Sequence, residues 1–250
     1  MLMKKNISET RLDKETKVHH IFEVIAGKYD LMNNVISIFL HKKWRRDALN
    51  KIGIEKGSRV IDLCCGTGVW TMDLAQQVGG DGTVYGIDFS MAMLNRAGEK
   101  LLAEGLENVN LLYGNIRNIP LAEGFFDYAT LGFGLRNVSG TRVALSEIHR
   151  VLKPGGKLLC LETSKPSLPL LRYLYYLYMR YLVPFLGFAF VKRFKEYRYL
   201  QESTWLFPEK AELVLLFHEA GFEDITVTEF LFGVVTMYTM VKGKINQVMD

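Results

Sequence analysis

The sequence is poor in cysteine and proline. Its three cysteines, two of them adjacent (Cys64 and Cys65), cannot form the disulfide framework of a small secreted domain, and they fit a reducing compartment. No spacing of cysteine and histidine indicates a zinc site, so no metal is expected. Six prolines and 22 glycines exclude collagen-like and low-complexity chains. Residues 1–17 are polar and lack the apolar run of a signal peptide, so we expect a cytoplasmic protein.

Neither sign of charge is in large excess. The 250 residues include 31 Lys and Arg against 27 Asp and Glu, and the net charge of +4 does not indicate a nucleic-acid partner. Hydrophobic residues make up 49% and charged residues 23%, an ordinary globular composition that excludes disorder as the main state. One α/β domain commonly reaches this length, so residues 1–250 are interpreted as a single domain.

Short apolar segments alternate with helical patterns along most of the chain. We expect helices at 14–29, 39–51, 67–78, 90–104, 142–152 and 208–220, and strands at 59–63, 83–89, 109–113, 128–133, 157–162, 225–231 and 234–241. This alternation predicts an α/β fold with a parallel, doubly wound sheet, and the last two strands form a hairpin around Gly233. A mostly parallel seven-stranded sheet that ends in an antiparallel hairpin is the Rossmann-like layout of class I S-adenosylmethionine-dependent methyltransferases. A dinucleotide-binding sheet has six parallel strands instead.

A turn with two glycines follows the first predicted strand. Residues 62–68 read DLCCGTG, and the glycines let the backbone approach a ligand at the carboxyl edge of the sheet. Asp88 closes the second strand, where a carboxylate can accept both ribose hydroxyls of an adenosine. Both a nicotinamide dinucleotide and S-adenosylmethionine are compatible with this glycine turn and carboxylate. Thr71 in place of a third glycine and the acidic Asp62 favour cationic S-adenosylmethionine over a pyrophosphate.

Three longer motifs are more specific than this turn: YDLMNNVIS at 29–37, GFGLRNV at 132–138 and RVLKPGG at 150–156. With them the chain resembles the C-methyltransferases of menaquinone and ubiquinone biosynthesis (the UbiE/MenG family) over essentially its whole length. The double cysteine of the turn is more similar to the menaquinone-only members. The resemblance implies methyl transfer from S-adenosylmethionine to a ring carbon of demethylmenaquinol, a prenylated naphthoquinol, in the last step of menaquinone biosynthesis.

The resemblance also implies where the cofactor binds. Many family members have serine at the position of Gly132, so that contact is lost or made by the backbone, and Gly132 is left out. Family contacts carry over to four residues, and the turn itself supplies three more. The predicted cofactor site comprises Asp62, Gly66, Thr67, Gly68, Asp88, Asn115 and Ile116.

Methylation of a quinol carbon requires that charge be pushed onto the ring as the phenolic proton leaves. Arg136 is too weak an acid to exchange its proton, so we expect it to stabilise the quinolate, with Asn137 orienting it. His41 is the candidate base because histidine titrates near neutral pH, although it could instead be the polar start of a helix. The acceptor pocket is predicted to contain Tyr29, Asp30, Met32 and Asn33.

Two segments outside the predicted sheet elements are expected to cover the site. Residues 1–52 form a helical cover, and residues 165–207 an apolar, aromatic insert or lid. Arginines inside 168–191, together with Pro184 and Gly187, argue against a simple membrane span. Aromatic residues with flanking cations favour peripheral contact of 168–195 with the inner face of the cell membrane, or binding of a prenyl tail. Packing on the core and a homodimer interface are the alternatives.

Other functions stay open with less support. The acceptor could be a benzoquinol of the ubiquinone pathway, or the chain could be a non-catalytic, cofactor-binding scaffold of a quinone-synthesis complex. A nucleic-acid methyltransferase is disfavoured, because GFGLRN replaces the Asn/Asp-Pro-Pro-aromatic stretch of the exocyclic-amine enzymes. Neither Cys64 nor Cys160 is placed as a nucleophile.

Overall fold

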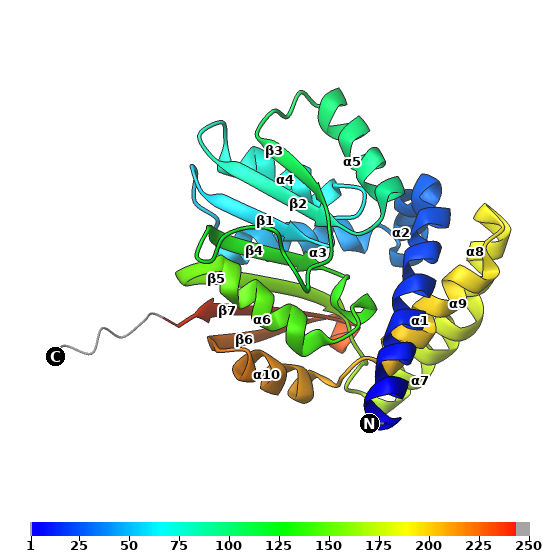
Figure 1. The fold of residues 1–250 in the computed structure, drawn as a ribbon. Coiled ribbons are helices and arrows are strands. Elements are labelled where there is room, and N and C mark those ends of the chain that lie inside the picture. The colour runs from blue at the N-terminus through cyan, green and yellow to red at the C-terminus, as the bar shows by residue number, and fades with distance from the viewer. Residues whose placement is uncertain (1, 244–250) are drawn as a thin grey trace.

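The structure is a computed structural model that describes residues 2–243, with side chains from residue 14 onward. A seven-stranded sheet has the order β3-β2-β1-β4-β5-β7-β6, shown in Figure 1. The strands are β1 (Arg59–Leu63), β2 (Thr83–Asp88), β3 (Val109–Tyr113), β4 (Phe126–Gly132), β5 (Leu152–Thr163), β6 (Phe222–Phe230) and β7 (Val235–Lys242). Strands β1 to β5 are parallel, and β7 runs antiparallel to both β5 and β6. The predicted fold class is confirmed.

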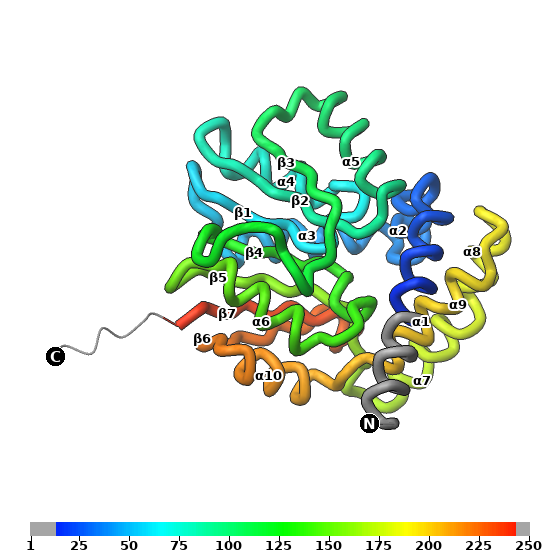
Figure 2. The backbone as a smooth tube through the Cα atoms, in the orientation of Figure 1, coloured from blue at the N-terminus to red at the C-terminus, as the bar shows by residue number. Residues whose placement is uncertain are grey.

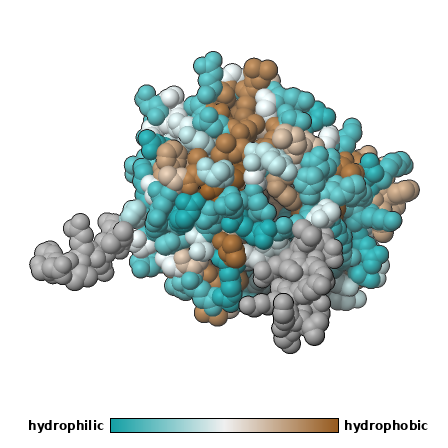
Figure 3. Space-filling model, viewed as in Figure 1, coloured by the Kyte–Doolittle hydropathy of each residue, from teal (hydrophilic) through white to brown (hydrophobic). Residues whose placement is uncertain are grey.

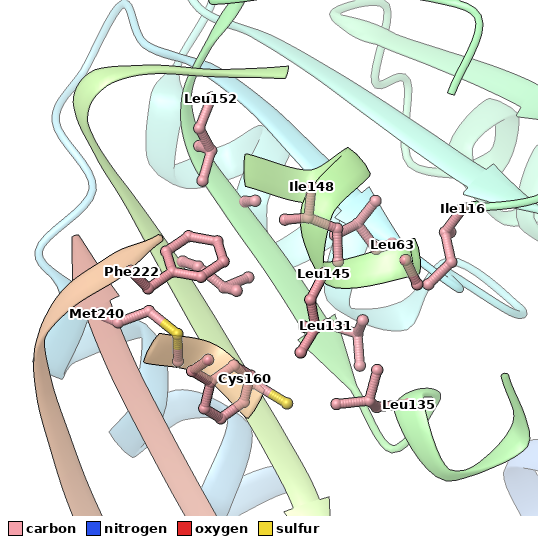
Figure 4. Packing of buried hydrophobic residues seen from close by; sticks show 14 of the residues in the cluster. Leu63, Ile116, Leu131, Leu135, Leu145, Ile148, Leu152, Cys160, Phe222 and Met240 are labelled. Atoms are coloured by element: carbon pink, nitrogen blue, oxygen red, sulfur yellow. The ribbon is translucent and has the colours of Figure 1, made fainter. Parts of the chain in front are cut away.

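Helices cover both faces of this sheet. On one face α3 (Leu40–Ile52) and α4 (Val69–Val78) share a buried cluster with alternate residues of β1 and β2. On the other face lie α6 (Thr141–Val151) and α10 (Lys210–Glu219). Figure 4 shows Leu145 and Ile148 of α6 packed near Leu63 and Leu131 of the central strands. The period of two along the strands therefore divides their side chains between two cores.

The pairing of the central strands places their carboxyl ends in one row. Leu63, the last residue of β1, pairs with Ile87 of β2 and Leu131 of β4. The next helix along the chain, α5 (Met91–Ala103), starts immediately after β2. Its predicted N-cap, Ser90, accepts a hydrogen bond at 3.2 Å from the backbone N–H of Met93. The loops at this edge are consequently held by short, capped connections.

The N-terminal segment is broken where a single helix was predicted. The expected helix at 14–29 is wrong at its end: α1 (Leu2–Ile25) stops early, a 3₁₀ turn covers Ala26–Lys28, and α2 (Tyr29–Ser37) begins a new helix. Gly27 lies in the turn, and glycine is the poorest helix former after proline. Figures 1 and 2 show α1 and α2 beside the sheet, near the helices of the insert.

The insert is more continuous than predicted. Helix α7 (Pro169–Leu177), a π-helical turn (Tyr178–Leu182) and α8 (Val183–Val191) follow without a break, and α9 (Phe194–Leu206) packs against α8. Pro184 and Gly187, which were expected to break a simple membrane span, do not interrupt this helical run. Proline sits in the first turn of α8, after the π turn, where its missing N–H is tolerated. A Cβ on Gly187 would lie 2.4 Å from the Tyr197 ring, so this glycine lets α9 approach closely.

The surface of the insert is unusually apolar. Among the described residues, Pro169–Val191 is the one helical stretch long and apolar enough to cross a membrane by length and composition, which alone is weak support for a span. Only 22% of its most apolar window is buried in the molecule, so it is no core helix. Figure 3 shows brown, apolar atoms at the edge of the molecule where α8 lies in Figure 1.

Candidate active site

A first cavity, here called the cofactor cavity, lies where the carboxyl ends of the central strands meet α1. Helices α1 and α2 contribute one wall, and the loops after β1, β2, β3 and β4 contribute the others. Its lining consists of Glu15, Phe22, Tyr29, Cys64, Gly66, Asp88, Phe89, Met93, Gly114, Asn115, Ile116, Gly132, Phe133, Gly134, Asn137, Val138 and Ser139.

Asp88 is the buried carboxylate of this cavity. Its two oxygens each accept a backbone N–H at 2.9 Å, one from Gly66 and one from Ser90. Burial raises the pKa of Asp88 to about 6, although these backbone hydrogen bonds act to lower it. The carboxylate is therefore ionised at neutral pH, and its remaining lone pairs can accept hydroxyl donors from a ligand.

Two glycines that follow or end β4 line the cofactor cavity and let neighbouring side chains pack close to the backbone. A Cβ on Gly132 would lie 2.7 Å from the Trp70 ring, and one on Gly134 would lie 2.6 Å from the Cβ of Cys64. Cys64 (φ 55°) and Phe133 (φ 59°) adopt the left-handed conformation that side chains disfavour. Strained residues of this kind concentrate at binding sites, where the surrounding structure holds them in place.

The predicted cofactor residues divide into two groups. Gly66, Asp88, Asn115 and Ile116 line the cofactor cavity, and so does Asn137, which was predicted to act on the acceptor. The Asn115 side-chain oxygen accepts the Arg117 backbone N–H at 3.0 Å, which fixes the orientation of its amide. Asp62, Thr67 and Gly68 are absent from the lining, and each has another role.

Asp62 lies beneath the turn rather than in the cavity. It is 1% exposed, and its oxygens accept hydrogen bonds from the hydroxyls of Thr71 (2.7 Å) and Thr130 (2.9 Å). Burial raises the pKa of Asp62 to about 6. Gly68 allows the turn to pack closely against α5, because a Cβ at this position would lie 2.8 Å from the Cβ of Ala97. In this structure the two residues support the turn that forms the wall.

Thr67 and Asp30 contact each other instead of lining a cavity. The Thr67 hydroxyl donates to Asp30 at 2.7 Å, and the Lys100 ammonium pairs with Asp30 at 2.5 Å while donating to the Thr67 carbonyl at 3.0 Å. Asp30, which was predicted in the acceptor pocket, here links α2, the turn and α5 through these contacts. Met32, also predicted there, is fully buried in the core between α1, α2 and α8.

A second cavity, here called the acceptor cavity, adjoins the first. Tyr29 and Phe133 line both cavities, so these two side chains form the boundary between them. The predicted residues Asn33, His41 and Arg136 line the acceptor cavity with largely apolar neighbours from α2, α3, the insert and the β6–β7 connection. Its further lining consists of Ile36, Ser37, Ile38, Leu40, Trp44, Arg45, Thr163, Tyr175, Tyr178, Met179, Leu200, Leu231, Val234 and Val235.

Arg136 is a buried cation held by a buried anion. Its guanidinium forms an ion pair with Glu162 and donates to the Phe133 carbonyl at 2.7 Å. Burial lowers the pKa of Arg136, but Glu162 together with Tyr29 and Tyr199 raises it by more, so the pKa lies above its ordinary value. Nε of Arg136 is buried and has no hydrogen-bond partner among the residues whose side chains the structure describes, which leaves one donor unpaired there.

His41 is buried beside Ser37, and the hydrogen bonds define its tautomer. Ser37 Oγ lies 2.6 Å from the Asn33 carbonyl and 2.6 Å from His41 Nδ1. The carbonyl can only accept, so the single hydroxyl proton of Ser37 points to it and His41 Nδ1–H donates to Ser37. Burial, and to a lesser degree the cations Arg45 and Lys42, lower the pKa of His41 to about 4. The ring is neutral at pH 7, and Nε2 is its acceptor.

Several residues of the site were not predicted. Ser37 and Glu162 belong to or follow motifs already noted in the sequence, but their partners are set by the fold. Glu15 of α1 bonds to Ser139 and forms an ion pair with Arg117, closing the helix over the cofactor cavity. No sequence signal marks these contacts, because they join residues more than 100 positions apart.

Comparisons with known proteins show the family of the chain. The model of the ubiE/COQ5 methyltransferase family matches residues 10–242. A demethylmenaquinone methyltransferase of Geobacillus sp. (strain WCH70) is 49% identical over 90% of this chain and 96% of its own. One of Staphylococcus epidermidis is 47% identical over 90% and 92%.

Solved structures support the fold at lower identity. A SAM-dependent methyltransferase from Aquifex aeolicus has a TM-score of 0.60 at 23% identity, over 79% of this chain and 89% of its own. One from Thermotoga maritima has 0.62 at 20% identity, over 90% and 99%. The expected S-adenosylmethionine-dependent methyl-transfer chemistry is thereby confirmed. The chain belongs to the ubiE/COQ5 methyltransferase family.

Proposed function

We propose that this protein transfers a methyl group from S-adenosylmethionine to a ring carbon of demethylmenaquinol, giving menaquinol. The observation that carries the proposal is the junction of two unlike cavities at Tyr29 and Phe133. One is at the carboxyl edge of the sheet with a buried carboxylate, and the other is apolar with a buried cation. The names of the relatives, which align over nearly their whole length, support the same acceptor.

The residues of the cofactor cavity fit S-adenosylmethionine. Ionised Asp88 faces the cavity with free lone pairs suited to the two ribose hydroxyls, and Asn115 and Ile116 lie beside it to meet the adenine. Gly132 and Gly134 line the same cavity on the side of β4, where the methionine half would lie. When bound, the cofactor supplies a methyl group activated by a sulfonium. The chain's part is to align it with the acceptor and exclude water.

The acceptor cavity then needs to favour the charge that develops on the quinol. Arg136 meets this need, because its guanidinium stays charged and has a free Nε donor for a quinolate oxygen. Neutral His41 presents Nε2 as an acceptor for the quinol hydroxyl. A pKa of about 4 makes His41 a weak base, so it orients the hydroxyl and takes its proton only as the S–CH3 bond breaks and the C–CH3 bond forms. The methylated carbon then loses its hydrogen as a proton, and the ring oxygen regains a proton from His41, which restores the quinol.

The insert fits a prenylated acceptor. Tyr175, Tyr178 and Met179 line the acceptor cavity, so a ring bound there has an apolar route outward along α7. We infer a cytoplasmic protein that contacts the inner face of the cell membrane peripherally through residues 168–195. The exposed apolar side chains of α7 and α8 support this inference.

The decisive experiment measures label transfer from methyl-labelled S-adenosylmethionine to chemically reduced demethylmenaquinone in detergent. Oxidised demethylmenaquinone and a reduced demethylated benzoquinone run in parallel. We expect label in the lipid only with a quinol, and a 10²- to 10³-fold lower kcat for Arg136→Lys. The exposed Arg96→Lys serves as matched control. Equal labelling of oxidised and reduced acceptors, or none with either, would refute the proposal.

A further inference from the structure

Two surface turns each hold a pair of apolar residues in the left-handed conformation. Ile38 (φ 49°) and Phe39 (φ 62°) join α2 to α3, and Leu231 (φ 48°) and Phe232 (φ 54°) join β6 to β7. Glycine or asparagine is usual there, and β-branched Ile38 is the least suited of all. The four side chains are 75%, 59%, 47% and 67% exposed, in that order. Neither the backbone conformation of the turns nor packing in the core explains why apolar residues occupy these four positions.

Both turns lie at the rim of the acceptor cavity, beside the insert. Ile38 and Leu231 line that cavity, whereas Phe39 and Phe232 do not. The Tyr178 hydroxyl donates to the Ile36 carbonyl at 2.5 Å, which joins the first turn to the insert. The backbone N–H of Ser167, two residues before α7, donates to the Phe232 carbonyl at 3.3 Å. The turns and the insert therefore surround one opening.

The insert extends this rim with a row of exposed apolar side chains. Single exposed apolar residues are normal on a protein surface, but a contiguous group of this kind marks an interaction surface. Between Pro169 and Val191, the apolar and aromatic side chains that are at least half exposed are Leu170, Tyr173, Leu174, Tyr181, Phe185, Phe188 and Phe190.

Positive charge is in excess around this rim, although Glu209 pairs with Arg172 and Glu229 pairs with Lys210 near the second turn. Residues 168–195 contain five Lys and Arg and no carboxylate, and residues 38–46 contain four Lys and Arg and no carboxylate. The Nζ atom of Lys42 lies 5.5 Å from the ring centre of Phe39, and the Nζ atom of Lys192 lies 4.9 Å from the ring centre of Phe188. Cations beside aromatic side chains complement the anionic lipid headgroups of a bilayer. A second copy of the chain would bring the same cations face to face.

We propose that the turns at Ile38–Phe39 and at Leu231–Phe232 insert into an anionic lipid surface and, with α7 and α8, seat the mouth of the acceptor cavity on the bilayer. An acceptor dissolved in the membrane then enters the cavity without crossing water. The identity of that acceptor rests on the proposed function, but the attachment does not.

The test measures co-sedimentation with vesicles of phosphatidylglycerol and phosphatidylcholine that contain no quinone. The double variant Phe39→Ser/Phe232→Ser removes one exposed aromatic residue from each turn and none from the cavity lining. Its partition coefficient is expected to fall roughly tenfold for each phenylalanine lost. The control is Leu102→Ser/Leu215→Ser on α5 and α10, where the leucines are 85% and 62% exposed. It should bind vesicles as the unchanged protein does.

A second variant separates insertion from folding. Phe39→Gly/Phe232→Gly places glycine at two left-handed positions, so its Tm should equal or exceed that of the unchanged protein while vesicle binding falls. Unchanged vesicle binding of both double variants would overturn the proposal, as would an equal loss in the control. The proposal would also be overturned if light scattering showed a dimer for the unchanged protein and monomers for the double variants while the variants still bound vesicles. The surface would then be an interface between two copies of the chain. Because no quinone is present, failure of methyl transfer to demethylmenaquinol leaves this test unaffected.

Discussion

Removal of the charge of Glu162 should destabilise the protein strongly. The Glu162 side chain is 1% exposed, and besides its ion pair with Arg136 it accepts the backbone N–H groups of Arg136 (3.2 Å) and Thr163 (2.8 Å). Glu162→Gln keeps the shape but leaves the Arg136 cation, itself 6% exposed, without a counter-charge. Breaking one side of a buried ion pair costs about 3–5 kcal/mol. For a chain of this length that corresponds to a fall in Tm of roughly 6–20 °C.

Differential scanning calorimetry at pH 7 measures this effect, with Glu99→Gln as the matched control. Glu99 is 63% exposed and pairs with Arg96 on the surface of α5, so its loss should cost less than about 1 kcal/mol. In a double-mutant cycle, Arg136→Met should recover part of the stability that Glu162→Gln loses, because no unpaired charge remains. A Tm for Glu162→Gln within the range of Glu99→Gln would refute the reasoning.

Three further predictions concern the cofactor side. Since the pKa of Asp88 is about 6 and the ionised form accepts hydroxyls, calorimetric affinity for S-adenosylmethionine should fall about tenfold per pH unit below 6. Over the same fall in pH, Asp88 increases the free energy of unfolding of the ligand-free protein. The reason is that its raised pKa lets Asp88 bind a proton in the folded protein at a higher pH than in the unfolded chain. Gly132→Ala, with its Cβ 2.7 Å from Trp70, should lower the urea-unfolding free energy by about 1–3 kcal/mol. Asp30→Asn, which loses the Lys100 ion pair, should raise KM for S-adenosylmethionine more than it lowers kcat; an unchanged KM would contradict this role of the link.

The local sequence pattern was sufficient to predict the strands of the sheet and the position of Asp88 at the edge that forms the cofactor cavity. The alternation of apolar segments defines the strands, since a strand with both faces buried must be apolar throughout. The position of Asp88 at the end of its strand follows from that pattern, and Ser90 caps the next helix through atoms three residues away. Such features depend on neighbours in the sequence, so they could be predicted without the fold.

Contacts between distant segments were beyond the sequence. Asp62 is predicted to contact the cofactor, and the fold adds a hydrogen bond from Thr130, 68 positions away. Asp30 is predicted to contact the acceptor, and the fold adds an ion pair with Lys100 of α5, 70 positions away. A carboxylate takes whichever donors the packing brings within reach, and a motif does not name them.

By itself, the sequence determined the fold class, the family and the edge of the sheet at which the cofactor cavity lies, because these follow from periodicity and from motifs of adjacent residues. Only the tertiary structure decided that Arg136 has Glu162 as its counter-ion and that His41 has one free nitrogen. It also decided that four segments far apart in the chain enclose one apolar cavity. The physical reason is that burial, ion pairing and hydrogen bonding act through space, whereas the sequence orders residues only along the chain.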